Sequence, residues 1–223
     1  MSRTLPIEQQ ERDEYRFGDG TELTLCPGTV GWAADDLRDP QVRRLWDAGR
    51  YEIIEGVLSV LPAARFRGGM VVDNLKFMLH AYFHGRQIPC AFSGEVDVVI
   101  APQRVVRADA AAVIGDDLAK FNALKFEELG TDWRDYPLSL PPTLIIESIS
   151  LGHELHDART KRRWYAAFGV KNYWIVDGYR KSLECLVLGG SEYRTDAVGS
   201  GTQLISLPAF PGLSIDLKKV WSA

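Results

Sequence analysis

Cysteine is scarce in this chain of 223 residues, and no two cysteines lie close together. The three are Cys26, Cys90 and Cys185, so no Cys-x-x-Cys pair exists to hold a structural zinc ion. An odd number of widely separated cysteines also argues against a disulfide framework. We therefore expect three reduced thiols in a cytoplasmic protein.

Long hydrophobic runs are missing as well. Apolar stretches such as Thr143–Ile146 are far too short to cross a bilayer, and residues 1–20 lack the apolar segment of a secretory signal. The sequence therefore predicts no membrane association. We expect an N-terminal arm at residues 1–30 and a single domain at residues 31–223, because this length suits one domain.

An excess of positive charge is also absent. Lysine and arginine together number 26, aspartate and glutamate 30, and the formal net charge is −4. Nucleic-acid-binding proteins usually carry a basic surface, so any contact with nucleic acid must come from a local basic patch.

The pattern that is present is typical of a mixed α/β protein. Apolar residues that recur every 3.6 positions predict helices, and alternating or β-branched segments predict strands. Helices are predicted at 40–49, 69–84, 118–128 and 154–168, and strands at 21–26, 51–60 (a hairpin), 95–100, 105–114, 143–149, 171–177, 182–188, 192–195 and 202–206. We expect a central mixed sheet flanked by helices.

Two acidic residues interrupt predicted strands. Asp109 lies within Val105–Ile114 and Glu147 within Leu144–Ile149, each among small or apolar neighbours. A buried carboxylate without a partner is costly, and two that lie on neighbouring strands would also repel each other. A divalent cation relieves that repulsion. Oxygen ligands without cysteine or paired histidine favour Mg²⁺ or Mn²⁺.

The helix predicted after Glu147 is locally basic. Lys161 lies four residues after Asp157, so the two share one helix face. Leu155–Arg163 holds four cationic residues and one acidic residue. Such a helix in an acidic protein is suited to contact phosphate, but a solvated helix with an ordinary Asp–Lys pair gives the same pattern.

Five segments, taken in order, resemble the Uma2 (DUF820) family of restriction-endonuclease-like proteins. They are Tyr51–Gly56 (YEIIEG, like YELIDG), Arg107–Ala110 (RADA, like RPDV), Pro142–Ser150 (PTLIIESIS, like PDLVVEVLS), Asp157–Lys161 (DARTK, like D-x-x-x-K) and Tyr165–Asp177 (YAAFGVKNYWIVD, like YAxAGVxEYWIVD). No single segment is specific, whereas the ordered set with its spacing is. The resemblance covers roughly residues 40–190.

The resemblance implies a restriction-endonuclease-like core of the PD-(D/E)XK nuclease superfamily and hydrolysis of DNA. It implies Asp109 and Glu147 as metal ligands and Lys161 as the active-site lysine. In the general superfamily motif the lysine follows the second acid by two residues, a position that holds Ile149 here. In the Uma2 pattern the lysine lies on the following helix, which Lys161 fits. Asp157 would position this lysine or support the metal ligands from outside.

The first segment of the resemblance supplies a further acidic candidate. Glu52 and Glu55 lie three positions apart, so strand alternation places them on opposite faces and only one of them would complete the site. Glu55 is favoured because it lies at the turn beside Gly56. Members of the family are often treated as homodimers, so the resemblance also implies DNA and a second copy of the chain as partners.

The sequence departs from the family pattern at three places. Ala108 replaces the proline of the second segment, which changes backbone stiffness more than chemistry. The histidine often found after the first hairpin is missing, and Arg65 or Arg67 could contact phosphate instead. Residues 115–142 are longer than usual and would form a lid, a dimer contact or a decoration.

Two other functions stay open at this point. A catalytically inactive nuclease-fold protein that binds nucleic acid or a protein partner would suit the acidic charge. A metal-dependent hydrolase of a small phosphate ester would use the same carboxylates. A metal site at His153 and His156 is not expected, because no third ligand has the right spacing.

Overall fold

Two units make up the part of the chain that the computed structural model describes. The described residues are 13–16, 22–62, 65–124, 133–149 and 156–222, with the backbone alone at 13–16, 22–23 and 156–159. The first unit lies within Met1–Ala63 and Asp97–Arg107, and the second within Ala64–Val96 and Ala108–Ala223. Strands β5 (Cys90–Ala101) and β6 (Arg104–Ile114) contribute residues to both.

The first unit combines a short helix with two hairpins. Its elements are β1 (Asp13–Arg16), β2 (Glu22–Leu25), the 3-10 helix η1 (Ala34–Arg38), α1 (Pro40–Ala48), β3 (Tyr51–Ile54) and β4 (Val57–Val60). Helix α1 begins where the Asp39 carboxylate accepts the Gln41 N–H, which satisfies one of the free donors of the first turn. Its apolar face buries Leu45 and Trp46 against Ile53 of β3.

The second unit is built on the longer part of a mixed sheet. Its remaining elements are α2 (Phe66–Gly85), α3 (Asp116–Asn122), the 3-10 helix η2 (Trp133–Asp135), β7 (Leu144–Ser148), α4 (His156–Phe168), β8 (Asn172–Asp177), β9 (Ser182–Gly189), β10 (Glu192–Ser200), β11 (Leu204–Ser206), β12 (Ser214–Asp216) and α5 (Leu217–Val220). The strand order is β10-β9-β8-β7-β6, and β5 pairs with β6. Strands β7 and β8 pair in parallel. The pairs β6–β7, β8–β9 and β9–β10 are antiparallel.

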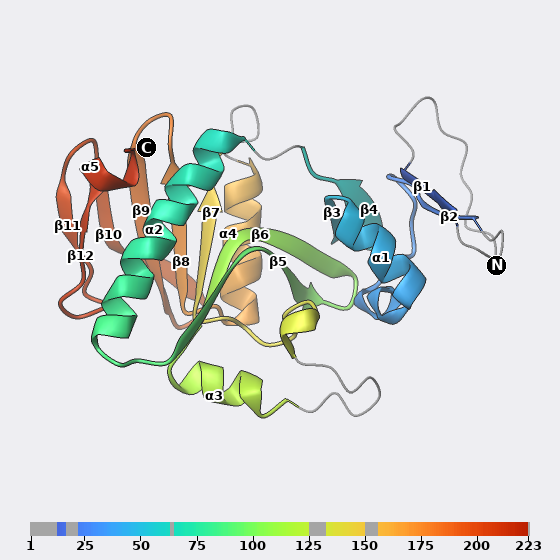
Figure 1. Cartoon of the computed structure of the whole chain (residues 1–223), viewed down its shortest axis with the longest axis horizontal. Helices are drawn as coiled ribbons and strands as arrows, with labels where there is room; N and C mark the ends of the chain where they lie inside the picture. Colours follow the sequence, from blue (N-terminus) through green and yellow to red (C-terminus); the bar gives the residue numbers. More distant parts are fainter. Residues whose placement is uncertain (1–12, 17–21, 63–64, 125–132, 150–155, 223) are drawn as a thin grey trace. The chain divides into compact units, whose positions relative to one another are not determined.

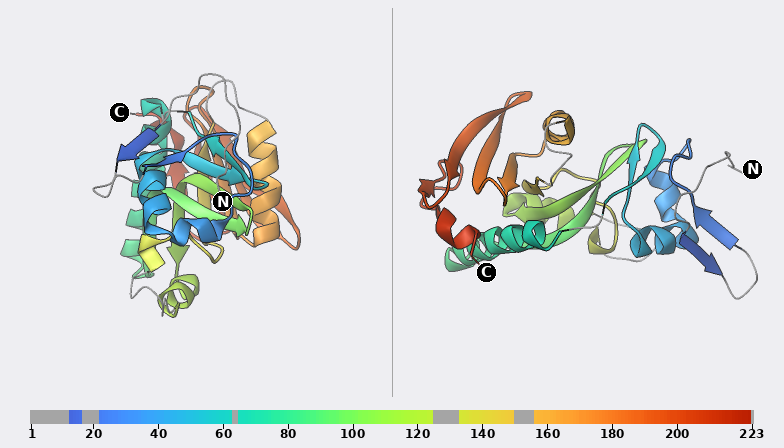
Figure 2. Two further views of the ribbon diagram at one scale, coloured as in Figure 1. Left: turned by 90° about the vertical axis from the view of Figure 1, so that its right-hand side faces the viewer. Right: turned by 90° about the horizontal axis from the view of Figure 1, so that it is seen from above.

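Helices α2 and α4 cover opposite faces of this sheet, as the two views in Figure 1 and Figure 2 show. On one face Ile146 and Trp174 pack with Leu75 and its neighbours on α2 in one continuous apolar core. Successive residues of a strand point to opposite faces, so the residues next to Ile146 on β7 and next to Trp174 on β8 face α4. Tyr173 is one of them, and its ring lies 5.2 Å from the ring of Tyr165 on α4.

The predicted central mixed sheet flanked by helices is confirmed, and most predicted elements lie within a few residues of the observed ones. One predicted helix end is wrong, because the helix expected at 118–128 ends at Asn122, with Ala123 as its C-cap. The helix expected at 69–84 is α2, which begins earlier, at Phe66, and has Arg86 as its C-cap. The left-handed conformation that ends the helix falls on Gln87, whose φ is 56°. The short elements β12 and α5 were not predicted, because β12 has only three residues and α5 only one helical turn.

Helix α3 is fastened to the end of the sheet by one buried carboxylate. Asp117 accepts hydrogen bonds from the Thr143 hydroxyl at 2.9 Å and from the Lys171 ammonium at 2.7 Å. Burial favours the neutral carboxyl, but the hydrogen bonds from Lys171, Lys120 and Thr143 outweigh it and lower the pKa of Asp117. The segment 115–142 therefore has a firm attachment at its start.

We predict that Asp117→Asn lowers the free energy of unfolding by about 1–3 kcal/mol at pH 7. A depressed pKa stabilises the fold above the ordinary carboxyl pKa, and this contribution disappears as the pH falls through the folded-state value. The difference between variant and wild type should therefore shrink in acid. Urea unfolding at neutral and acidic pH measures it, with the exposed neighbour Asp116→Asn as control. A pH-independent difference would contradict the assignment.

Candidate active site

The register of β6 and β7 brings the two predicted carboxylates face to face. Ala110 pairs with Ile146 and Ala111 with Ile145 in an antiparallel ladder. Continued by one pair, this register sets Asp109 directly opposite Glu147. Side chains at directly opposed positions point to the same face, with Cβ atoms about 5 Å apart. The expectation that the two acids lie on neighbouring strands is therefore met by the geometry.

Both carboxylates lie on the face of the sheet that carries α4. Their strand neighbours Ala110 and Ile146 point the other way, into the core beneath α2. Glu147 is only 9% exposed, whereas Asp109 is half-buried. The pair thus joins one carboxylate that is nearly removed from water to one that solvent reaches.

Helix α4 supplies two partners of Glu147. The Tyr165 hydroxyl donates to Glu147 Oε1 at 2.7 Å, and Lys161 Nζ lies 3.5 Å from the same oxygen. The two residues are four apart, so they occupy successive turns of one helix face. Lys161 is 5% exposed and Tyr165 fully buried. A buried carboxylate is stable in its charged form only with such partners, which accounts for the position of α4 over β7.

Asp109 is held from the end of β7. Its Oδ2 accepts the backbone N–H of Ser148 at 2.7 Å, immediately after Glu147. The Ser148 side chain points to the opposite face, where its Oγ lies 2.9 Å from the place that a Cβ on Gly68 would occupy. The glycine therefore allows the start of α2 to approach the strand end that fixes Asp109.

The donor set suits a hard divalent cation. Asp109 and Glu147 offer carboxylate oxygens from adjacent positions, and no group of three or more His, Cys, Asp or Glu side chains gathers anywhere in the described residues. Magnesium is commonly held by one or two carboxylates while water and phosphate oxygens complete its coordination. A zinc site would require more protein ligands, usually nitrogen or sulfur. The residues present therefore fit Mg²⁺ or Mn²⁺.

The basic helix is less available to phosphate than its sequence indicates. Lys161 is buried against Glu147, and Arg162 donates to the Tyr193 carbonyl oxygen at 3.0 Å and faces Glu184 at 3.9 Å. Arg163 is exposed. Asp157 lies on α4 one turn before Lys161, but its side chain is outside the described part, so its role stays a prediction.

The acidic candidates of the first unit have other contacts there. Glu55 is exposed at the β3–β4 turn with a φ of 51° and forms an ion pair with Arg104. Glu52 is buried, and its Oε1 accepts the Arg107 N–H at 2.9 Å. Arg107 itself forms a buried ion pair with Asp97 at 2.8 Å. The choice between the two glutamates for the site stays a prediction.

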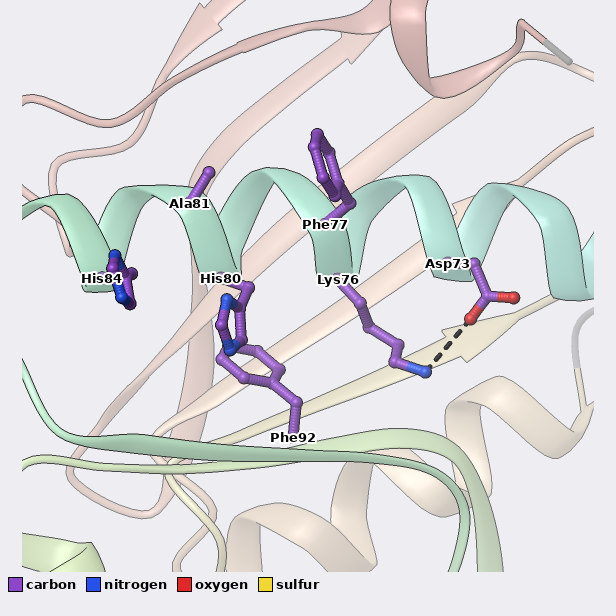
Figure 3. A pocket seen from close by; sticks show the side chains of 7 residues that line it. All are labelled: Asp73, Lys76, Phe77, His80, Ala81, His84 and Phe92. Atoms are coloured by element: carbon purple, nitrogen blue, oxygen red, sulfur yellow. Dashed lines mark hydrogen bonds and ion pairs between the residues drawn. The ribbon is translucent and has the colours of Figure 1, made fainter.

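A hollow on the outer side of α2 is separate from these carboxylates. It has a volume of about 530 Å³, and Figure 3 shows its lining: Asp73, Lys76, Phe77, His80, Ala81, His84 and Phe92. Lys76 Nζ lies 3.0 Å from Asp73 Oδ1, so its charge is already paired. The hollow belongs to the opposite face of the sheet from Asp109 and Glu147.

Tyr165 is the residue at this site that sequence reasoning missed. It belongs to an apolar helix pattern, where tyrosine is usually a core residue. Its ring does pack against Tyr173, but its hydroxyl donates a hydrogen bond to Glu147. The available signal was its spacing of one helical turn from Lys161, which places it on the face already assigned to the site.

The comparisons with known proteins concern the family and the fold of the chain. The family model of Uma2, described as "Putative restriction endonuclease", matches residues 40–218. The fold is similar to a crystal structure described as a "putative nuclease belonging to DUF820" from Anabaena variabilis, with 13% sequence identity and a TM-score of 0.59. The match covers 77% of this chain and 89% of that chain. No curated protein matches. The predicted family resemblance is confirmed.

We predict strong energetic coupling between Lys161 and Glu147. In a double-mutant cycle, Lys161→Met leaves a buried carboxylate without its cation, whereas Lys161→Met combined with Glu147→Gln does not. We expect a coupling energy of about 1–3 kcal/mol in urea unfolding. The matched cycle of Arg162→Met and Glu184→Gln, a half-exposed pair at 3.9 Å, should give less than about 1 kcal/mol. Equal coupling in both cycles would contradict the burial argument.

Proposed function

The chain belongs to the Uma2 family, and we propose that it is a Mg²⁺- or Mn²⁺-dependent endonuclease that hydrolyses phosphodiester bonds in DNA. One observation carries this proposal. Asp109 and Glu147 face each other across β6 and β7, and Lys161 lies 3.5 Å from Glu147. Two carboxylates and one amine at a single point of the sheet are the groups that metal-assisted phosphodiester hydrolysis requires.

Asp109 and Glu147 would hold the cation. When bound, it supplies Lewis-acid polarisation of the scissile phosphate and lowers the pKa of a nearby water. The half-buried Asp109 gives this position access to solvent and substrate, while the buried Glu147 keeps one side of it dry. A low local dielectric strengthens the interactions that stabilise charge in the transition state.

Lys161 would act on the charge that develops during hydrolysis. Water adds to phosphorus, one P–O ester bond breaks, and negative charge accumulates on the phosphoryl oxygens. An ammonium fixed beside Glu147 can orient the water or stabilise that charge without reorganising. Asp157 on the preceding turn is proposed to position Lys161, and Glu55 is proposed as the additional acid of the site.

Duplex DNA is the proposed partner, together with a second copy of the chain. A two-fold homodimer would present one carboxylate pair to each strand of a duplex. The three cysteines are free in the structure, which supports the proposal of a reducing, cytoplasmic location. Among the described residues, no helix has the length and apolar character needed to span a membrane.

We predict that the protein nicks supercoiled plasmid in the presence of Mn²⁺ or Mg²⁺. Glu147→Ala and Asp109→Asn should each lower the rate at least about 100-fold, because each removes a proposed metal ligand. Gel electrophoresis of plasmid over time measures the rate, and a chelator should abolish it. Glu184→Gln is the matched control, since this acid lies on the same face two strands further along.

The outcomes separate the proposed function from its alternatives. Cleavage that survives in Glu147→Ala contradicts the assigned site. Binding of DNA without cleavage under any divalent cation would favour a catalytically inactive nuclease-fold protein. Hydrolysis of small chromogenic phosphodiesters without plasmid cleavage would favour a hydrolase of small phosphate esters.

We further predict that Tyr165 positions Glu147 for the cation. Tyr165→Phe removes only the hydroxyl that donates to Glu147 Oε1. A hydrogen bond to a charged group contributes about 1.5–3 kcal/mol, so the Mn²⁺ concentration for half-maximal cleavage should rise about tenfold or more. The maximal rate at saturating Mn²⁺ should change less. Titration of Mn²⁺ against the rate of plasmid nicking measures both quantities.

Tyr193→Phe is the matched control for Tyr165→Phe. Tyr193 is also buried, and its hydroxyl donates to the Val170 carbonyl oxygen at 2.6 Å. Burial raises the pKa of Tyr193, so the phenol stays protonated and keeps this bond at neutral pH. Its loss should lower stability without moving the Mn²⁺ dependence. An equal shift in both variants would show that Tyr165 acts only through stability.

A further inference from the structure

Arg67, near the start of α2, has an arrangement typical of an anion-binding arginine. Its Cζ lies 5.3 Å from the centre of the Tyr179 ring, and its Cγ lies 3.1 Å from the place that a Cβ on Gly178 would occupy. The side chain is exposed, yet the aromatic ring and the close glycine restrict it. Ordering a long arginine in advance lowers the entropic cost of binding an anion.

This arginine has no carboxylate to neutralise it within the part of the chain that the structure describes. Arg180, in the same turn as Tyr179, contacts Asp177 at 3.3 Å but leaves 64% of its side chain exposed. Arg65 is exposed as well. These residues form a locally basic surface in an acidic protein, which we call the arginine edge: Arg65, Arg67 and Arg180.

The arginine edge adjoins the strand ends that carry the carboxylate pair. Gly68, the next residue after Arg67, lies so near Ser148 that a Cβ on it would come within 2.9 Å of Ser148 Oγ, and the Ser148 N–H donates to Asp109. Tyr179 and Arg180 follow directly after β8, which runs parallel to β7, so both strands end on this side. An anion bound at Arg67 would therefore lie at these strand ends on the α2 side of the sheet, without occupying the site on the α4 side.

We propose that Arg67 binds a backbone phosphate of DNA next to the phosphate that is cut. This inference rests on the proposed function, because it places the same substrate at the same strand ends. A guanidinium has donors in a fork that matches phosphate oxygens, and these N–H donors lie in its plane, so an aromatic ring beside its face does not block them. Arg65 and Arg180 extend the positive surface on either side. The contact is to the backbone, so it would be independent of base sequence.

The salt dependence of DNA binding tests the proposal. A protein that neutralises one more phosphate releases more counterions, so the slope of log K against log salt steepens by about 0.9. Arg67→Met removes the charge but keeps the alkyl stem that packs against Gly178. We expect this variant to show a slope shallower by about 0.9 and an affinity about eightfold lower at 100 mM KCl.

The measurement uses fluorescence anisotropy of a short labelled duplex with chelator present, from about 50 to about 200 mM KCl. Arg67→Lys should restore the slope, because the charge remains. Arg86→Met is the matched control: Arg86 also stacks on a tyrosine, Tyr82 at 4.0 Å, but at the other end of α2. It should leave the slope unchanged.

An Arg67→Met slope equal to that of the wild type overturns the proposal, and so does a wild-type protein that does not bind the duplex. An equal change in Arg86→Met also overturns it, because the effect would then be one of overall charge. The proposed function is tested separately by the loss of cleavage in Glu147→Ala. If Arg67→Met shows the shallower slope but Glu147→Ala still cleaves DNA, the arginine edge is supported and the proposed catalytic pair is rejected.

Discussion

The buried charge of Glu147 is the constraint on which the arrangement of the second unit depends. A carboxylate at the centre of a sheet loses most of its hydration. Hydrogen-bond donors and an opposite charge from the protein must replace the stabilisation that water gave. Tyr165 and Lys161 do so from one face of α4, at 2.7 and 3.5 Å. The helix is therefore held over β7 by a polar requirement as well as by its apolar contacts.

That requirement explains features of α4 that apolar packing alone does not. A lysine that is 5% exposed would be costly on an ordinary amphipathic helix, because its charge would be desolvated. Here the same desolvation strengthens its interaction with Glu147. Tyr165 also carries structure at the helix end, since its carbonyl oxygen accepts N–H groups from Gly169 and Val170. One residue thus fixes both where α4 ends and how Glu147 is directed.

Asp109 and Glu147 could be singled out from the sequence because each is an acid among the small or apolar residues of a predicted strand, and the family resemblance implied their role. The register that sets them opposite each other was not predictable, since it depends on pairing between residues far apart in the sequence, such as Ala111 with Ile145. The function of Tyr165 was hidden for a related reason. Its ring satisfies the core pattern, and its hydroxyl has meaning only once β7 is placed beneath α4.

The distribution of charge shows why the basic helix and the DNA-facing surface need not be the same element. Lys161 forms an ion pair with Glu147, and Arg162 contacts the Tyr193 carbonyl oxygen and Glu184. Much of the positive charge of α4 is therefore paired within the protein. A chain with a net charge of −4 has no general attraction for a polyanion. Attraction of DNA must then come from exposed arginines that form no ion pair within the described part of the protein. Arg67 meets this condition at the strand ends, which lets the acidic pair hold a cation while a neighbouring residue holds the substrate.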